Sequence, residues 1–163
     1  MVGAHPEVKE IWEWLRGITD PEIPVLSVSD LGLVRDIRWN GPDDELVITI
    51  TPTYSGCPAI DLIAADIRSA MKERGIERLK LETKLSPAWT TDWMTEEAKE
   101  RLRTYGIAPP PRLVQLNSQE PAIVCPQCGS SDTALVSRFG STPCKSLYRC
   151  LVCLEPFDAF KRH

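Results

Sequence analysis

The 163-residue sequence carries two cysteine pairs of identical spacing in its last quarter, Cys125-Pro126-Gln127-Cys128 and Cys150-Leu151-Val152-Cys153. Two thiolates separated by two residues can bind one tetrahedral metal ion, and two such pairs complete a shell of four sulfur ligands. Gly129 follows the first pair, where a metal-binding knuckle often needs a positive φ, whereas Leu154 holds that place in the second. The spacing predicts an all-β zinc ribbon over residues 122–163. Its structural zinc ligands would be Cys125, Cys128, Cys150 and Cys153.

Composition and charge narrow the class of protein. The sequence shows no basic segment followed by an apolar one at its start, and its apolar runs are far below the roughly 18 residues of a membrane helix. We therefore expect a cytoplasmic protein without a membrane partner, in which thiols stay reduced and metal binding is favoured over disulfides. Residues 1–121 hold 14 basic and 20 acidic residues, and residues 122–163 hold 5 and 3. Neither part has the clustered Lys and Arg of a phosphate-binding surface, so no nucleic-acid partner is expected.

Hydrophobic periodicity over residues 7–85 predicts a small α+β domain in the order α-β-β-α-β. Apolar residues recur on one helical face in two segments, and they alternate with polar or β-branched residues in the second and third predicted strands. The predicted helices span 7–18 and 58–74, and the predicted strands span 33–39, 45–51 and 76–85. The turn at 40–44 makes a hairpin of the first two strands, and the helices would cover one face of the sheet.

A third helix is predicted over residues 96–105, with Thr95 as its N-cap. This helix closes a first domain of residues 1–105. The run Pro109-Pro110-Pro111 then marks a proline-rich linker over 106–121, and the ribbon follows over 122–163.

The irregular segment before this helix contains Trp89 and Trp93. Exposed aromatic residues in such loops commonly anchor partner proteins, so both tryptophans are candidates for partner binding. The alternative is that both rings pack as local core, which is common in a small domain.

Cys57 lies between a predicted strand and a predicted helix, directly before Pro58. Proline is favoured at the first helical position, which places Cys57 beside the positive end of that helix. Such a position stabilises a thiolate and lowers a cysteine pKa below its usual value of ~8.5. The alternative is a buried cysteine that acts as a small hydrophobe. Both histidines, His5 and His163, are terminal, which disfavours a Cys–His hydrolase.

Three further side chains are candidates for metal chemistry. Asp20 and Glu22 precede the first strand and could join Cys57 in holding a transient iron ion, although acidic residues beside prolines often form turns instead. Cys144 is a fifth cysteine of the ribbon and exceeds a shell of four ligands. As an extra thiol, it is spare, competes with one of the two pairs for the metal, or acts as a ligand together with Cys57 of the other domain. The alternative is a structural turn residue.

Several motifs together resemble the metal–sulfur cluster biosynthetic family, which includes the SufT-like proteins of iron–sulfur assembly. They are Asp20-Pro21-Glu22-Ile23-Pro24-Val25, Asp30-Leu31-Gly32-Leu33-Val34, and Thr53 with Cys57-Pro58. The resemblance covers about residues 7–85. It implies that Cys57 is the family's reactive cysteine and that Asp20 and Glu22 are its acidic motif, acting as transient ligands of iron or an iron–sulfur cluster.

Motifs in the rest of the chain narrow this to a nearly full-length resemblance to the D proteins encoded with multicomponent phenylacetyl-CoA epoxidases of phenylacetate catabolism. The motifs are Ser86 to Trp93, Tyr105 to Pro110, and Glu155-Pro156-Phe157-Asp158. This resemblance implies an accessory factor that helps to insert iron or clusters into the oxygenase and reductase subunits, its expected partners. No catalytic activity of its own is expected, and a homodimer is an open alternative for its assembly.

Two other functions stay open from sequence. One is a non-catalytic scaffold subunit of the oxygenase complex. The other is a thiol-redox protein that uses Cys57, although no second cysteine follows at the Cys-x-x-Cys spacing.

Overall fold

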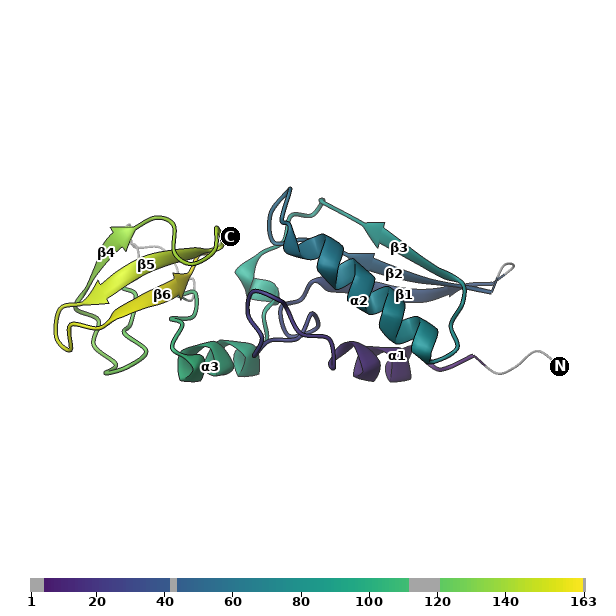
Figure 1. Ribbon diagram of the computed structural model, residues 1–163, viewed down its shortest axis with the longest axis horizontal. Helices are drawn as coiled ribbons and strands as arrows, with labels where there is room; N and C mark the ends of the chain where they lie inside the picture. The colour runs from purple at the N-terminus through teal and green to yellow at the C-terminus, as the bar shows by residue number, and fades with distance from the viewer. Residues whose placement is uncertain (1–4, 42–43, 112–120, 163) are drawn as a thin grey trace. The chain divides into compact units, whose positions relative to one another are not determined.

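The computed structural model describes residues 5–41, 44–111 and 121–162. The chain divides between Met94 and Thr95 into two compact units, each built around a three-stranded sheet (Figure 1). The first unit is α+β and the second carries the all-β ribbon, which confirms the predicted fold class. Among the described residues, no helix combines the length and the apolar character needed to cross a membrane.

The first unit follows the predicted order α-β-β-α-β. Its elements are α1 (Val8–Leu15), β1 (Val34–Asn40), β2 (Glu45–Ile50), α2 (Ala59–Glu73), β3 (Leu79–Thr83) and the short 3-10 helix η1 (Thr91–Trp93). β1 and β2 form an antiparallel hairpin, and β3 pairs in parallel with β2. A parallel neighbour requires a crossover connection, which α2 supplies by lying across the sheet (Figure 1).

The central strand β2 is buried on both faces. On one face, Leu46, Ile48 and Ile50 are fully enclosed, as the helix-covered side of a small sheet should be. On the other face, Val47 is 3% exposed and Thr49 is 1% exposed. The alternation of β2 predicts that one face of the strand is buried. In the structure the side chains of the other face are buried as well.

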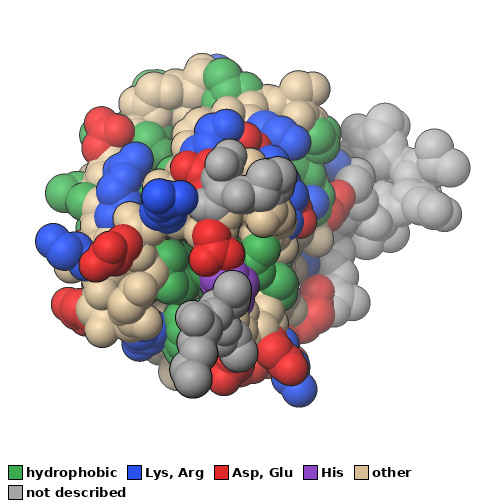
Figure 2. Space-filling model, turned by 90° about the vertical axis from the view of Figure 1, so that its right-hand side faces the viewer, with side chains coloured by type: hydrophobic (Ala, Val, Ile, Leu, Met, Phe, Trp, Pro, Cys, Tyr) green, Lys and Arg blue, Asp and Glu red, His purple; other side chains and the backbone are tan. Residues whose placement is uncertain are grey.

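Charged side chains from the two edge strands flank this second face. Arg38 of β1 and Lys80 of β3 lie opposite Val47 in the strand register. Arg38 pairs with Glu82 at 2.9 Å, and Lys80 pairs with the same carboxylate at 3.0 Å. The aliphatic stems of such residues can cover apolar surface while their charged ends remain in water. Basic and acidic side chains are likewise interspersed on the face of the molecule shown in Figure 2.

The loop before β1 packs against the segment that contains both tryptophans. The indole N–H of Trp89 donates to the carbonyl of Leu31 at 2.8 Å. The guanidinium of Arg35 lies 3.5 Å from the ring centroid of Trp93. Gly32, with φ +69°, approaches the backbone of Trp93 so closely that no side chain fits between them.

The second unit begins with α3 (Glu96–Tyr105), followed by β4 (Thr133–Ser137), β5 (Lys145–Cys150) and β6 (Pro156–Phe160) in the sheet order β4-β5-β6. The hydroxyl of Thr95 accepts a hydrogen bond from the N–H of Ala98 at 3.1 Å, so Thr95 is the N-cap predicted from sequence.

The boundary between the units differs from the one expected from sequence, which placed the third helix in the first domain. The N–H of Ala108 donates to the carbonyl of Asp158, and the N–H of Phe160 donates to the carbonyl of Ala108, both at 2.9 Å. These bonds tie the chain that leaves α3 to β6, so α3 belongs to the ribbon unit. Most of the linker predicted over 106–121 lies outside the described residues.

We expect Gly32→Ala to lower the free energy of unfolding of the first unit by about 3 kcal/mol, from left-handed backbone strain and overpacking together. A Cβ at this position would lie 2.6 Å from the carbonyl oxygen of Trp93. Urea unfolding followed by tryptophan fluorescence measures this unit, because all five tryptophans precede residue 95. Gly41→Ala is the matched control, since a Cβ there meets no atom within 4 Å. Equal destabilisation by both variants would contradict the argument.

Candidate metal centre and reactive cysteine

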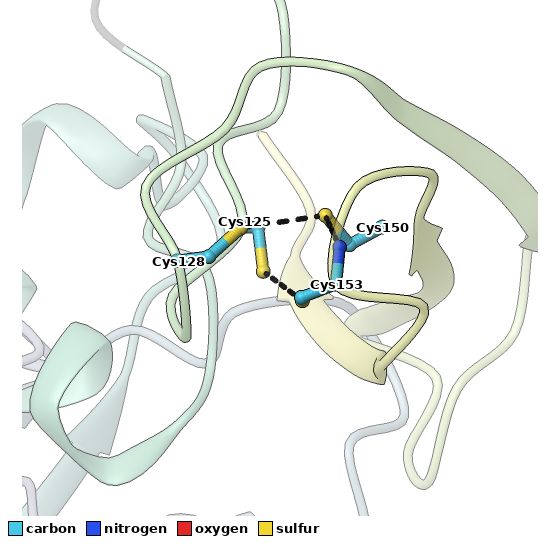
Figure 3. Close-up of side chains that lie close together, drawn as sticks. All are labelled: Cys125, Cys128, Cys150 and Cys153. Carbon is cyan, nitrogen blue, oxygen red and sulfur yellow. Dashed lines mark hydrogen bonds between the residues drawn. The ribbon is translucent and has the colours of Figure 1, made fainter.

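The four cysteines of the two Cys-x-x-Cys pairs converge at one end of the ribbon (Figure 3). Their Sγ atoms all lie within 4.8 Å of one another. The Cys125–Cys153 sulfur distance is 3.7 Å, and the Cys128–Cys150 distance is 3.5 Å. A tetrahedral ion with metal–sulfur bonds of about 2.3 Å would separate its sulfur ligands by about 3.8 Å. The observed spacing therefore fits one tetrahedral metal ion.

Each knuckle is followed by a residue with a left-handed backbone conformation. The N–H of Gly129 donates to the carbonyl of Cys125 at 2.9 Å, and Gly129 has the positive φ of 76° that the sequence predicts. Leu154, in the corresponding place after the second pair, also has a positive φ, of 66°. Sequence reasoning could not identify this second left-handed residue, because leucine carries no local preference for that conformation.

The sulfur atoms are not equivalent as acids. The backbone N–H of Cys153 donates to Sγ of Cys150 and lowers the pKa of Cys150 to about 7. A backbone N–H at Glu155 lowers the pKa of Cys153, but burial and the neighbouring sulfur atoms outweigh it and raise that pKa to about 12. A bound dication would favour ionisation of all four thiols, so metal binding would release protons.

A metal held here would have a structural role. None of the six cysteines forms a disulfide, so the four that converge are available as ligands. Four thiolates suit zinc or iron and leave no open coordination position for a substrate. The ion would join the knuckle before β4 to the turn between β5 and β6.

Cys57 occupies the turn that leads from β2 into α2. Its N–H donates to the carbonyl of Tyr54 at 3.3 Å, and its carbonyl accepts from the N–H of Ile60 at 3.2 Å. Pro58 follows with helical dihedral angles, and α2 starts at the next residue. Cys57 therefore lies beside the start of α2, as predicted, and it is 8% exposed.

Asp20 is a turn-forming residue in this structure. Its Oδ1 accepts the N–H of Glu22 at 2.7 Å and the N–H of Ile23 at 3.0 Å. Within the described part of the chain, the four ribbon cysteines form the only group of three or more His, Cys, Asp or Glu placed to share a metal ion. Asp20 and Glu22 are thus not assembled with Cys57 into such a group. Their role as transient ligands stays a prediction.

The remaining candidates differ in their surroundings. Cys144 is 4% exposed, and its Sγ lies 3.0 Å from Oγ1 of Thr142, outside the group of four sulfur atoms. Its pairing with Cys57 would join the two units and stays a prediction.

Trp89 is 4% exposed, which fits the local-core alternative and not an exposed docking residue. Trp93 is half-buried beneath Arg35.

Comparison with known proteins assigns each unit to a known domain. The model of the iron–sulfur cluster assembly protein family matches residues 9–77, and that of the PaaD zinc beta ribbon domain matches residues 109–161. An Escherichia coli protein named as the D component of a 1,2-phenylacetyl-CoA epoxidase is 52% identical over 158 residues, covering 97% of this chain and 94% of the relative. The chain belongs to the PaaD family.

The N-terminal part of this PaaD-family chain has further relatives. An Fe-S protein maturation auxiliary factor of Porphyromonas gingivalis is 38% identical over 91 residues, which cover 55% of this chain and 85% of the relative. The crystal structure of a domain of unknown function from Bacillus anthracis matches with a TM-score of 0.53 and 26% identity, covering 58% of this chain and 89% of that one. The two resemblances inferred from sequence motifs are therefore confirmed.

Most of the candidate site residues of this PaaD-family chain lie within one of the two matched ranges. Asp20, Glu22 and Cys57 lie within the iron–sulfur assembly match. All four convergent cysteines and Cys144 lie within the ribbon match.

We expect Asp20→Ala to lower the free energy of unfolding of the first unit by about 2 kcal/mol, because two backbone N–H groups lose a charged acceptor. Asp20→Asn should cost much less, since its side-chain oxygen can accept the same two bonds. Urea unfolding followed by tryptophan fluorescence compares the two. A small, equal effect of both substitutions would show that the carboxylate does not hold the turn.

The purified chain is expected to hold one zinc ion, and Cys128→Ser should lose it because three thiolates remain. Cys144→Ser is the matched control and should keep the metal. Elemental analysis gives the metal content, and the loss of ribbon structure on chelation is followed by NMR. Full zinc content in Cys128→Ser, or its loss in Cys144→Ser, would contradict the assigned ligand set.

Proposed function

We propose that this chain is an accessory maturation factor of a multicomponent phenylacetyl-CoA epoxidase. In this proposal Cys57 transiently binds iron or an iron–sulfur cluster that is destined for another subunit. The observation that carries the proposal is the position of Cys57, the one cysteine of residues 1–94, at the start of α2 and within the iron–sulfur assembly match.

The surroundings of Cys57 support transient binding. Cys57 lies next to the first turn of α2, where a helix presents free backbone N–H groups and the positive end of its dipole. A single thiolate leaves most of the coordination positions of an iron ion to other donors, so the cargo can pass to a client with more ligands. Asp20 and Glu22 are retained as acidic candidates because both lie in the matched segment.

The ribbon has a different role in this proposal. Its four thiolates would hold a structural zinc ion permanently, and a closed shell offers no position for catalysis. We therefore assign no catalytic activity to the chain itself. The clients would be the oxygenase and reductase subunits that the sequence resemblance implies, and the Escherichia coli relative is likewise named as a component of a phenylacetyl-CoA epoxidase.

The test is the iron and acid-labile sulfide content of the co-expressed oxygenase and reductase subunits. We expect Cys57→Ala to lower one or both contents several-fold while the amounts of the subunits stay the same. Cys144→Ala is the matched control, because it removes another buried thiol that lies outside the iron–sulfur assembly match. It should leave both contents unchanged.

The same experiment separates this proposal from the scaffold alternative. Equal iron and sulfide contents with wild type and Cys57→Ala would reject the transient-ligand role. Loss of the subunit complex with Cys128→Ser, but not with Cys57→Ala, would instead favour a scaffold that acts through the ribbon.

A further inference from the structure

A groove of about 600 Å³ lies on one face of the ribbon sheet. Leu135 of β4 lies opposite Tyr148 of β5, and Ser146 of β5 lies opposite Ala159 of β6. Because alternate residues of a strand point to the same face, these four side chains share one side of the sheet, where they line the groove. Its floor is therefore mainly apolar.

Three cations stand at the end of this groove, and its described lining residues include no Asp or Glu. Arg138 follows β4, and Lys161 and Arg162 follow β6. Arg138 and Arg162 are exposed and make no ion pair with a described residue. The amine of Lys161 donates to the carbonyl of Pro143 at 2.8 Å and lies 4.3 Å from the ring centroid of Phe139.

The acidic residues of the ribbon lie elsewhere. Asp132 precedes β4 and Glu155 precedes β6, so both belong to the metal-binding end of the sheet. Asp158 lies opposite Leu147 on β5, on the other face from Tyr148, and its carboxylate accepts a hydrogen bond from the hydroxyl of Ser141. The positive charge at the groove therefore has no acidic side chain of the ribbon beside it.

We propose that this groove binds an extended acidic segment of a partner protein that carries an aromatic or aliphatic anchor. The apolar floor and the ring of Phe139, which is 68% exposed, offer contacts to such an anchor. The guanidinium groups of Arg138 and Arg162 can each bind a carboxylate in a bidentate manner. Three cations on a short apolar groove suit a peptide better than a nucleic acid, which needs a longer basic track.

The test selects a displayed library of random dodecapeptides on the zinc-loaded full-length chain. The enriched peptides should combine Asp or Glu with an aromatic or aliphatic residue. A labelled synthetic peptide of that consensus should bind the double variant Arg138→Glu/Arg162→Glu at least about tenfold more weakly in fluorescence anisotropy, a loss of about 1.4 kcal/mol.

Arg149→Glu is the matched control, since Arg149 is exposed and lies on the opposite face of β5. It should bind the peptide like the wild-type chain. Zinc content confirms that each variant retains the folded ribbon. The proposal depends neither on Cys57 nor on the maturation role.

Three results would overturn this proposal. The first is a library that yields no enriched peptide. The second is an enriched consensus without acidic residues, or equal weakening by Arg149→Glu. The third is a labelled single-stranded oligonucleotide that binds more tightly than the selected peptide.

Discussion

Burial of both faces of β2 constrains the arrangement of the first unit. A strand enclosed on both sides needs a hydrogen-bonded neighbour at each edge, and β1 and β3 fill those positions. Because β3 is parallel to β2, the chain must return along the sheet before β3 begins, and α2 makes that return. The turn between β2 and α2 is therefore fixed at one end of the sheet, and this turn holds Cys57. The position of the candidate reactive thiol thus follows from the packing of the core.

Local signals in the sequence predicted most elements of this fold. The apolar repeats of α1 and α2 and the alternation in β2 and β3 need only neighbouring residues to be interpreted, and each of these elements lies within its predicted range. The cysteine spacing likewise predicted the four residues that converge in space.

The features that sequence could not predict depend on contacts between distant residues. Asp20 before a proline is compatible with a metal ligand or a turn, and only its two backbone hydrogen bonds identify the turn. The buried ring of Trp89 donates a hydrogen bond to the carbonyl of Leu31, which is distant in the sequence. The placement of α3 in the ribbon unit rests on the pairing of Ala108 with β6, which no local pattern in the helix indicates.

Gly129 and Leu154, which follow the two knuckles, share a left-handed backbone conformation but differ in its free-energy cost. This difference bears on how long a bound metal ion would stay in the site. Glycine adopts a left-handed backbone without strain, so Gly129 closes the first knuckle freely. Leu154 bears about 1 kcal/mol of steric cost in the same conformation, and opening of the second knuckle relieves it. Strain that is present only in the closed state speeds dissociation. Metal exchange is therefore expected to begin at the Cys150–Cys153 side, while the Cys125–Cys128 side retains the ion longest.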